Sequence, residues 1–178
     1  HAITRSVRDS AAILDATHGP ELGSRFTAPT PQGSFLSQVE KAPRSLRIAL
    51  MLTPISSSPV DPEVIEAVTS VARLCESLGH HVEEAAPNLN AAAIAQASFA
   101  LSGSSIAADI MDRAKLTGQT PGPDLLEPIT MAFFGYGQHV KGMDVYRANH
   151  TLQTAAVTVA RFMQNYDLIL SPTLGAPP

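Results

Sequence analysis

The chain has 178 residues, of which 44% are hydrophobic and 16% charged, and its formal net charge at pH 7 is −4. This length is that of one domain, or a large part of one, with a buried core. Mixed acidic and basic residues argue against a nucleic-acid-binding surface, and no apolar run of about 18 residues suggests a membrane span. The lone Cys75 cannot form an internal disulfide, which favours a reducing compartment, taken here as the cytoplasm.

The first predicted helix runs from Val7 to about Thr17. Ser6 is a suitable N-cap, and its spacing to Asp9 is that of a capping box. Gly19-Pro20 ends the helix, because glycine accepts the left-handed conformation and proline cannot continue a helix. The segment 20–45, rich in Pro, Gly, Ser and Thr, is predicted to be a long surface connection containing one short turn.

A strand, a helix and a second strand are predicted between residues 46 and 85. Residues 46–52 are apolar apart from Arg47, as in a strand covered on both faces. Asp61-Pro62 supplies an N-cap and a proline at the first helical position. The predicted apolar face of the helix consists of Val64, Val68, Val71, Cys75 and Leu78, and Gly79 is its C-cap. With strand 81–85 these elements form a βαβ unit, for which parallel strands are expected.

Three more helices and one more strand are predicted in the remaining sequence. Residues 90–115 are Ala-rich and helical, with a weak point at Ser102-Gly103-Ser104-Ser105. Residues 125–139 and 143–165 form two further helices, and Leu168–Leu170 is a short buried strand. The predicted fold class is α/β, with helices around part of a parallel or mixed sheet that contains one βαβ unit.

Residues suited to chemistry are few in this sequence. The serines of 102–105 look like a nucleophile loop, but no base is placed beside them, so a helix break is the preferred interpretation. The six histidines lack a metal-ligand spacing, and no glycine-rich cradle follows a strand, so neither a metal nor a nucleotide cofactor is predicted. Gln96, Phe99 and Tyr136 are the candidate substrate-binding residues.

Three segments together resemble the amidase signature family. Residues 3–15 (ITRSVRDSAAILD) are similar to the segment that follows the catalytic region of those enzymes. Residues 46–82, with LRIA, DPEV and LGHHV, are similar to the family's βαβ unit, and residues 146–173, ending in YDLILSPT, to its last segment. The resemblance implies an amidase signature fold in which residues 1–178 are the C-terminal portion of a single amidase domain, without its N-terminal catalytic portion.

The resemblance also implies a reaction. Family members hydrolyse amide bonds with a serine nucleophile, a second serine joined through a cis peptide, and a lysine, all upstream of the first matching segment. This chain is therefore expected to hold no catalytic residue and to be inactive alone. The implied substrate is a small linear or cyclic amide with a non-peptide C–N bond. No cofactor, metal, nucleic acid or membrane is implied, and a homodimer of the whole enzyme is left open.

Two departures from the family pattern bear on the substrate. His1-Ala2 stands where the family usually has Gly-Pro, a variation that we associate with hydrolases of nylon-oligomer cyclic dimers. Residues 129–134 lack the arginine that binds glutamine in the glutamine-hydrolysing subunits of tRNA-dependent amidotransferases. Stretches 96–102 and 133–136, expected near the nucleophile, carry no Arg or Lys, which favours a neutral amide. The two alternatives are a non-catalytic α/β binding module and an A-type subunit of such an amidotransferase.

Overall fold

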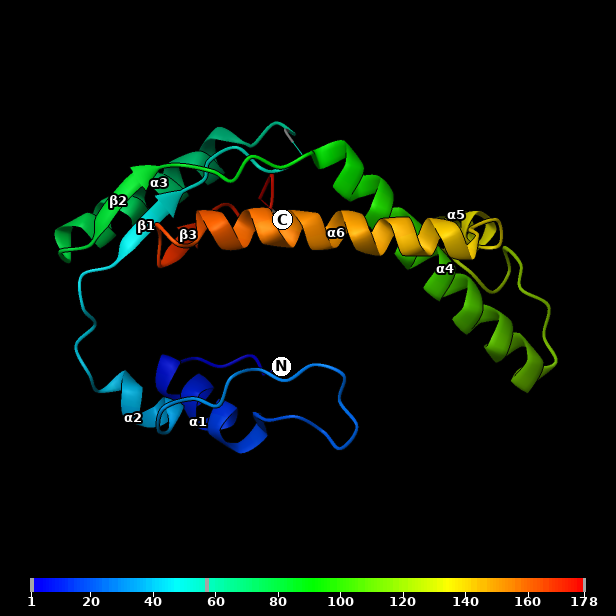
Figure 1. Ribbon diagram of the computed structural model, residues 1–178, viewed down its shortest axis with the longest axis horizontal. Coiled ribbons are helices and arrows are strands. Elements are labelled where there is room, and N and C mark those ends of the chain that lie inside the picture. Colours follow the sequence, from blue (N-terminus) through cyan, green and yellow to red (C-terminus); the bar gives the residue numbers. More distant parts are fainter. Residues whose placement is uncertain (1, 57, 178) are drawn as a thin grey trace. The chain divides into compact units, whose positions relative to one another are not determined.

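The computed structural model describes residues 2–56 and 58–177, so the departure at His1 lies outside the described residues. The chain divides into two compact units, residues 1–44 and 45–178, which are described separately. Figure 1 labels the helices and strands of both units.

The first unit contains two helices, α1 (Val7–Thr17) and α2 (Phe35–Val39), which pack together. Ser6 Oγ accepts the backbone N–H of Asp9 at 3.1 Å, which confirms the predicted N-cap. The Asp15 carboxylate accepts the N–H groups of Phe35 and Leu36 at 2.6 and 3.0 Å. An acidic side chain of α1 thus satisfies two free donors at the start of α2, which lies within the long connection.

The second unit contains a parallel sheet of three strands in the order β2-β1-β3. The strands are β1 (Arg47–Leu50), β2 (His81–Glu84) and β3 (Leu168–Leu170). The predicted parallel neighbours and the third strand are therefore confirmed, but the third strand is not buried as predicted, since it lies at the edge of this sheet and Leu168 is 50% exposed. In the central strand Ile48 and Ala49 are 3% and 0% exposed, and since successive side chains point to opposite faces, both faces are covered there.

Helix α3 (Pro62–Ser77) connects β1 to β2 and completes the predicted βαβ unit. Asp61 Oδ1 accepts the N–H of Glu63 at 2.8 Å, and Gly79 has a φ of +89° just beyond the helix end. The predicted apolar face is wrong in part, because Val71 and Leu78 are 45% and 67% exposed whereas Ala72 is 4% exposed. Successive helical residues lie about 100° apart, and the helix has turned its Ala72 side inward.

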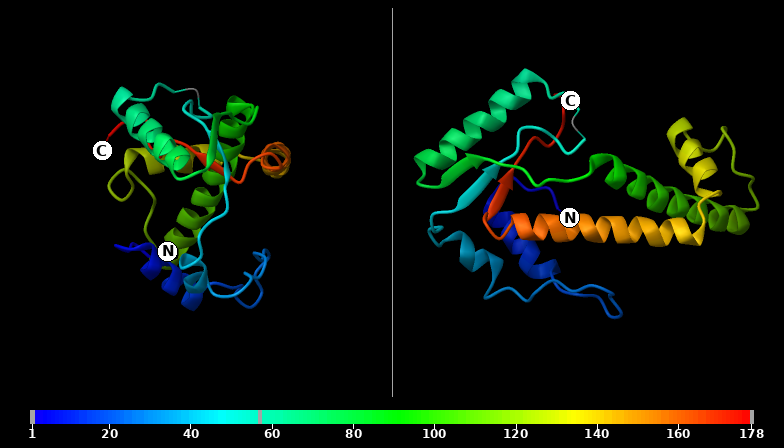
Figure 2. Two further views of the ribbon diagram at one scale, coloured as in Figure 1. Left: turned by 90° about the vertical axis from the view of Figure 1, so that its left-hand side faces the viewer. Right: turned by 45° about the horizontal axis from the view of Figure 1, so that its top comes forward.

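Helices α4 (Ala91–Thr117), α5 (Pro128–Gly137) and α6 (Gly142–Phe162) form the rest of the second unit. Helix α4 packs against both others, and α6 runs back to the sheet and leads into β3 (Figure 2). The predicted weak point at 102–105 is wrong, since α4 is continuous through it. The glycine there serves close packing against α5 instead of ending the helix.

By length and composition, helix α4 is long and apolar enough to cross a membrane. The apolar runs of the sequence did not predict such a helix. A core helix of a folded protein meets the same criterion. The buried positions of α4 are small residues: Ala97, Ala100, Gly103 and Ala107. Ala97 and Ala100 form a core with Ala148 of α6, so α4 packs closely within this unit.

A side-chain hydrogen bond joins the two edges of the sheet. The Tyr166 hydroxyl, just before β3, donates to Glu83 Oε1 of β2 at 2.5 Å. This hydrogen bond to a carboxylate raises the pKa of Tyr166 above its ordinary value of 10.0. The tyrosine therefore stays protonated at neutral pH and holds the donor role that the contact requires.

Candidate functional site

A hollow of about 280 Å³ lies among α4, α5 and α6 and contains two of the three predicted site residues. Its floor is made of alanines, and its polar groups come from all three helices. The lining residues are Ala93, Gln96, Ala97, Ala100, Tyr136, Asp144, Arg147, Ala148 and Thr151. Residues that carry an amide, a phenol, a carboxylate, a guanidinium and a hydroxyl thus line one concave, partly apolar surface, as in small-molecule sites.

The structure brings Gln96 and Tyr136 together from positions forty residues apart in the sequence. Phe99 does not line this hollow. It is 53% exposed and stacks on Phe133 of α5, with ring centroids 5.1 Å apart and an interplanar angle of 16°. Two of the three predicted residues, Gln96 and Tyr136, therefore line the hollow, and the third, Phe99, lies outside its lining. Their role in substrate binding stays a prediction.

Tyr136 is positioned by a close crossing of two helix backbones. A Cβ at Gly137 would fall on the carbonyl group of Gly103 and 2.8 Å from the Cβ of Ala107. A Cβ at Gly103 would lie 2.8 Å from Cδ1 of Tyr136. Only glycine at both positions permits this approach, which holds the Tyr136 ring against α4. The sequence shows glycines on both sides of Tyr136, but not that the packing partner of Gly137 is Gly103.

The two charged residues of the hollow, Asp144 and Arg147, were not predicted as site residues. They lie three residues apart on α6, and Asp144 Oδ2 accepts the backbone N–H of Lys141 at 3.1 Å. Among residues 2–56 and 58–177, no acidic group lies within 4.0 Å of the Arg147 guanidinium. The sequence signal that could have identified them is helical spacing, because both lie within about one turn of Ala148, which is buried.

Arg147 changes the electrostatics expected from the sequence. The stretches 96–102 and 133–136 do lack Arg and Lys, as the printed sequence shows. Helix α6 nevertheless contributes an arginine, Arg147, to the lining of the same hollow as Gln96 and Tyr136. The argument for a neutral substrate rested on the absence of a cation from those two stretches, and the structure removes that ground.

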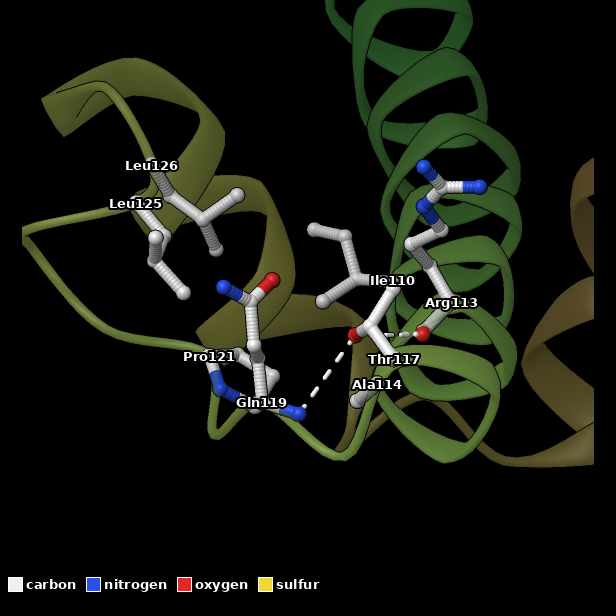
Figure 3. Close-up of a pocket in the computed structure, with 8 residues that line it drawn as sticks. All are labelled: Ile110, Arg113, Ala114, Thr117, Gln119, Pro121, Leu125 and Leu126. Atoms are coloured by element: carbon white, nitrogen blue, oxygen red, sulfur yellow. Dashed lines mark hydrogen bonds between the residues drawn. The ribbon is translucent and has the colours of Figure 1, made fainter.

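A smaller hollow of about 200 Å³ lies between the end of α4 and residues 119–126 (Figure 3). Its apolar wall is made of Ile110, Leu125 and Leu126. Thr117 Oγ1 donates to the carbonyl of Arg113 at 3.0 Å and accepts the N–H of Gln119 at 3.4 Å. These hydrogen bonds hold the turn after α4.

The structure also shows the surroundings of the serine, metal-ligand and cysteine candidates considered from the sequence. Ser104 Oγ donates to the carbonyl of Leu101 at 3.0 Å within α4, which is a local helix contact and not that of an activated nucleophile. In the part of the chain that the structure describes, no three His, Cys, Asp or Glu side chains gather as metal ligands would. Cys75 is half-buried on α3 and is not disulfide-bonded.

The fold and this arrangement of helices are those of a known class of enzymes. The sequence profile of the amidase family matches residues 2–178. The chain therefore belongs to the amidase family, and its mixed α/β fold is that of the amidase signature enzymes.

The chain is similar to proteins of known activity. It is 29% identical over 177 residues to 6-aminohexanoate-cyclic-dimer hydrolase of Paenarthrobacter ureafaciens, covering 96% of this chain and 35% of the hydrolase. A structure of 6-aminohexanoate cyclic dimer hydrolase complexed with substrate superposes with a TM-score of 0.77, at 28% identity over 93% of this chain and 35% of that one. A bacterial aryl acylamidase structure gives a TM-score of 0.84 at 20% identity, covering 97% of this chain and 36% of its own, which supports the fold alone.

A further similarity is shorter. Over 82 residues the chain is 33% identical to the A-type subunit of glutamyl-tRNA(Gln) amidotransferase from Staphylococcus aureus strain Newman, which is 46% of this chain and 17% of that protein. The chain spans about a third of the length of the hydrolase, so its relatives contain much that has no counterpart here.

Proposed function

We propose that this chain is the C-terminal part of an amidase that hydrolyses a non-peptide C–N amide bond in a small linear or cyclic amide. The observation that carries the proposal is the match of the amidase family to residues 2–178. The similarity to an amide hydrolase along 96% of the chain supports it. By the family resemblance, the serine, cis-serine and lysine lie outside these residues, and the reaction needs no cofactor.

The proposed chemistry passes through a covalent acyl-enzyme. A serine oxygen attacks the amide carbonyl, the C–N bond breaks, and the amine leaves with a proton delivered through the lysine and the second serine. Water then cleaves the serine ester and releases the carboxylate. In this scheme the residues of the present chain bind and orient the amide, with Gln96 and Tyr136 as polar contacts and Phe99 as an apolar one.

The first test compares the isolated chain with a chimera. Residues 2–178 would replace the matching third of 6-aminohexanoate-cyclic-dimer hydrolase, and both proteins would be assayed on cyclic and aryl amides. We expect turnover from the chimera and none from the chain alone, because positioned nucleophile and base supply most of the rate. Circular dichroism and labelling of the active serine by a fluorophosphonate establish that the chimera is assembled. A chimera that is folded and labelled at its active serine but does not hydrolyse the amides would contradict the proposal and favour a binding module.

The second test concerns the predicted polar contacts to the substrate. In an active chimera, Gln96→Ala and Tyr136→Ala should each lower kcat/KM by about tenfold, the scale expected for losing one hydrogen bond to the substrate. Leu116→Ala is the matched control, since Leu116 is 82% exposed and does not line the hollow. Equal kcat/KM values for all three variants would show that the hollow is not part of the substrate site.

A glutamine-hydrolysing component of an amidotransferase is the second candidate function. Two observations favour it: the similarity over 82 residues to the staphylococcal amidotransferase, and the guanidinium of Arg147 in the hollow. Glutamine carries a free carboxylate for which arginine is the usual partner. Ammonia release from glutamine by the chimera, faster than hydrolysis of the neutral amides, would select this function over the first.

A further inference from the structure

We propose that Arg147 makes the hollow among α4, α5 and α6 a binding site for the carboxylate of a small ligand. Arg147, an exposed residue of α6, lines a concave surface together with four alanines, and Gln96 and Tyr136 belong to the same lining. A guanidinium offers paired N–H donors that match the two oxygens of a carboxylate. The amide and hydroxyl, carried by α4 and α5, provide further hydrogen-bond donors around such a group.

The alternative partner of the Arg147 guanidinium is a neighbouring acidic residue of the chain. Asp144 lies three residues earlier on α6 and is the acid of the same lining, yet its Oδ2 accepts the N–H of Lys141 at 3.1 Å. No ion pair within 4.0 Å joins Asp144 to Arg147 in the described part of the chain. Exposed pairs of this type are worth only about 0–1 kcal/mol, so a ligand carboxylate can compete for the arginine.

The two opposite charges also limit the class of ligand. Arg147 and Asp144 together make the lining neutral, so a dianion would meet repulsion as well as attraction. A monocarboxylate pairs with Arg147 alone, whereas a carboxylate with an ammonium group elsewhere satisfies both side chains. The volume of about 280 Å³ is near the lower limit for small-molecule sites and suits one short acid or one end of a longer substrate.

Applied to catalysis, this inference rests on the proposed function. If the hollow is part of the substrate site, the preferred amides carry a free carboxylate at the end that enters it. That is the opposite of the neutral preference drawn from stretches 96–102 and 133–136. The difference arises because α6, distant in sequence from the first stretch, contributes the cation.

The inference is tested by equilibrium binding to the 178-residue chain, measured by calorimetry with hexanoate, hexanamide and 6-aminohexanoate. Hexanoate should bind at least about tenfold more tightly than hexanamide, since charged hydrogen bonds contribute more than neutral ones. Arg147→Gln should abolish that difference and Arg147→Lys should retain part of it. Arg161→Gln, on the exposed end of the same helix and outside the hollow, should change nothing.

Equal binding of hexanoate and hexanamide, or equal losses in Arg147→Gln and Arg161→Gln, would overturn the inference. Circular dichroism spectra of the variants show whether a loss is due to unfolding, and Arg147→Lys keeps the test valid if Arg147→Gln is unfolded. Because binding is measured without turnover, the two proposals can fail separately. An inactive chimera with a carboxylate-selective chain overturns only the proposed function, whereas an active chimera with an unselective chain overturns only this inference.

Discussion

Replacing Gly137 with alanine is expected to lower the free energy of unfolding of the chain by about 3 kcal/mol. The added methyl group would fall on the backbone carbonyl of Gly103 and lie 2.8 Å from the Cβ of Ala107. Backbone atoms cannot move aside as a flexible side chain does, so α4 and α5 would have to separate along their contact. Urea denaturation followed by circular dichroism measures the loss.

Gly135→Ala is the matched control on the same helix. No atom lies within 4 Å of a Cβ placed at Gly135. Alanine there should leave the packing unchanged and stabilise the helix by up to about 1 kcal/mol, because glycine is the poorer helix former. A similar small stabilisation in both variants would show that the glycines of α5 act through helix propensity alone, and that the close crossing at Gly103 is not present in solution.

Replacing Ala72 with aspartate is expected to cost about 3–4 kcal/mol of folding free energy. Ala72 is 4% exposed on α3, the helix of the βαβ unit that packs against β2. A carboxylate at this position would lose its hydration, and the surrounding face of α3 is largely apolar. The thermal midpoint and the urea midpoint of the chain should both fall.

Val71→Asp, one residue away, provides the comparison. Val71 is 45% exposed, so its replacement should cost only about 0.5–1 kcal/mol, mainly through lost partial burial and helix propensity. The pair of variants therefore measures which face of α3 meets the sheet. A larger loss in Val71→Asp than in Ala72→Asp would restore the face predicted from the periodicity of the sequence.

Local chemistry in the sequence determined much of the secondary structure. Ser6 and Asp61 cap their helices as predicted, because a side chain two or three residues from its backbone partner needs no tertiary contact to reach it. The apolar strand beginning near Leu46 and the strand Leu168–Leu170 were also predictable. A short apolar run favours a strand because its side chains can pack on a sheet, although β3 lies at the edge of this sheet and is only partly buried.

Only the tertiary structure decided how these elements build a site. The sequence around Gly103 resembles a helix break, and it becomes a continuous helix because Gly137 of α5 packs against it. Gln96, Tyr136 and Arg147 share one hollow although each comes from a different helix. Periodicity reports which residues of one helix share a face, but not which other helix that face meets. Local patterns therefore predicted most of the elements, whereas the hollow and its arginine depended on long-range packing.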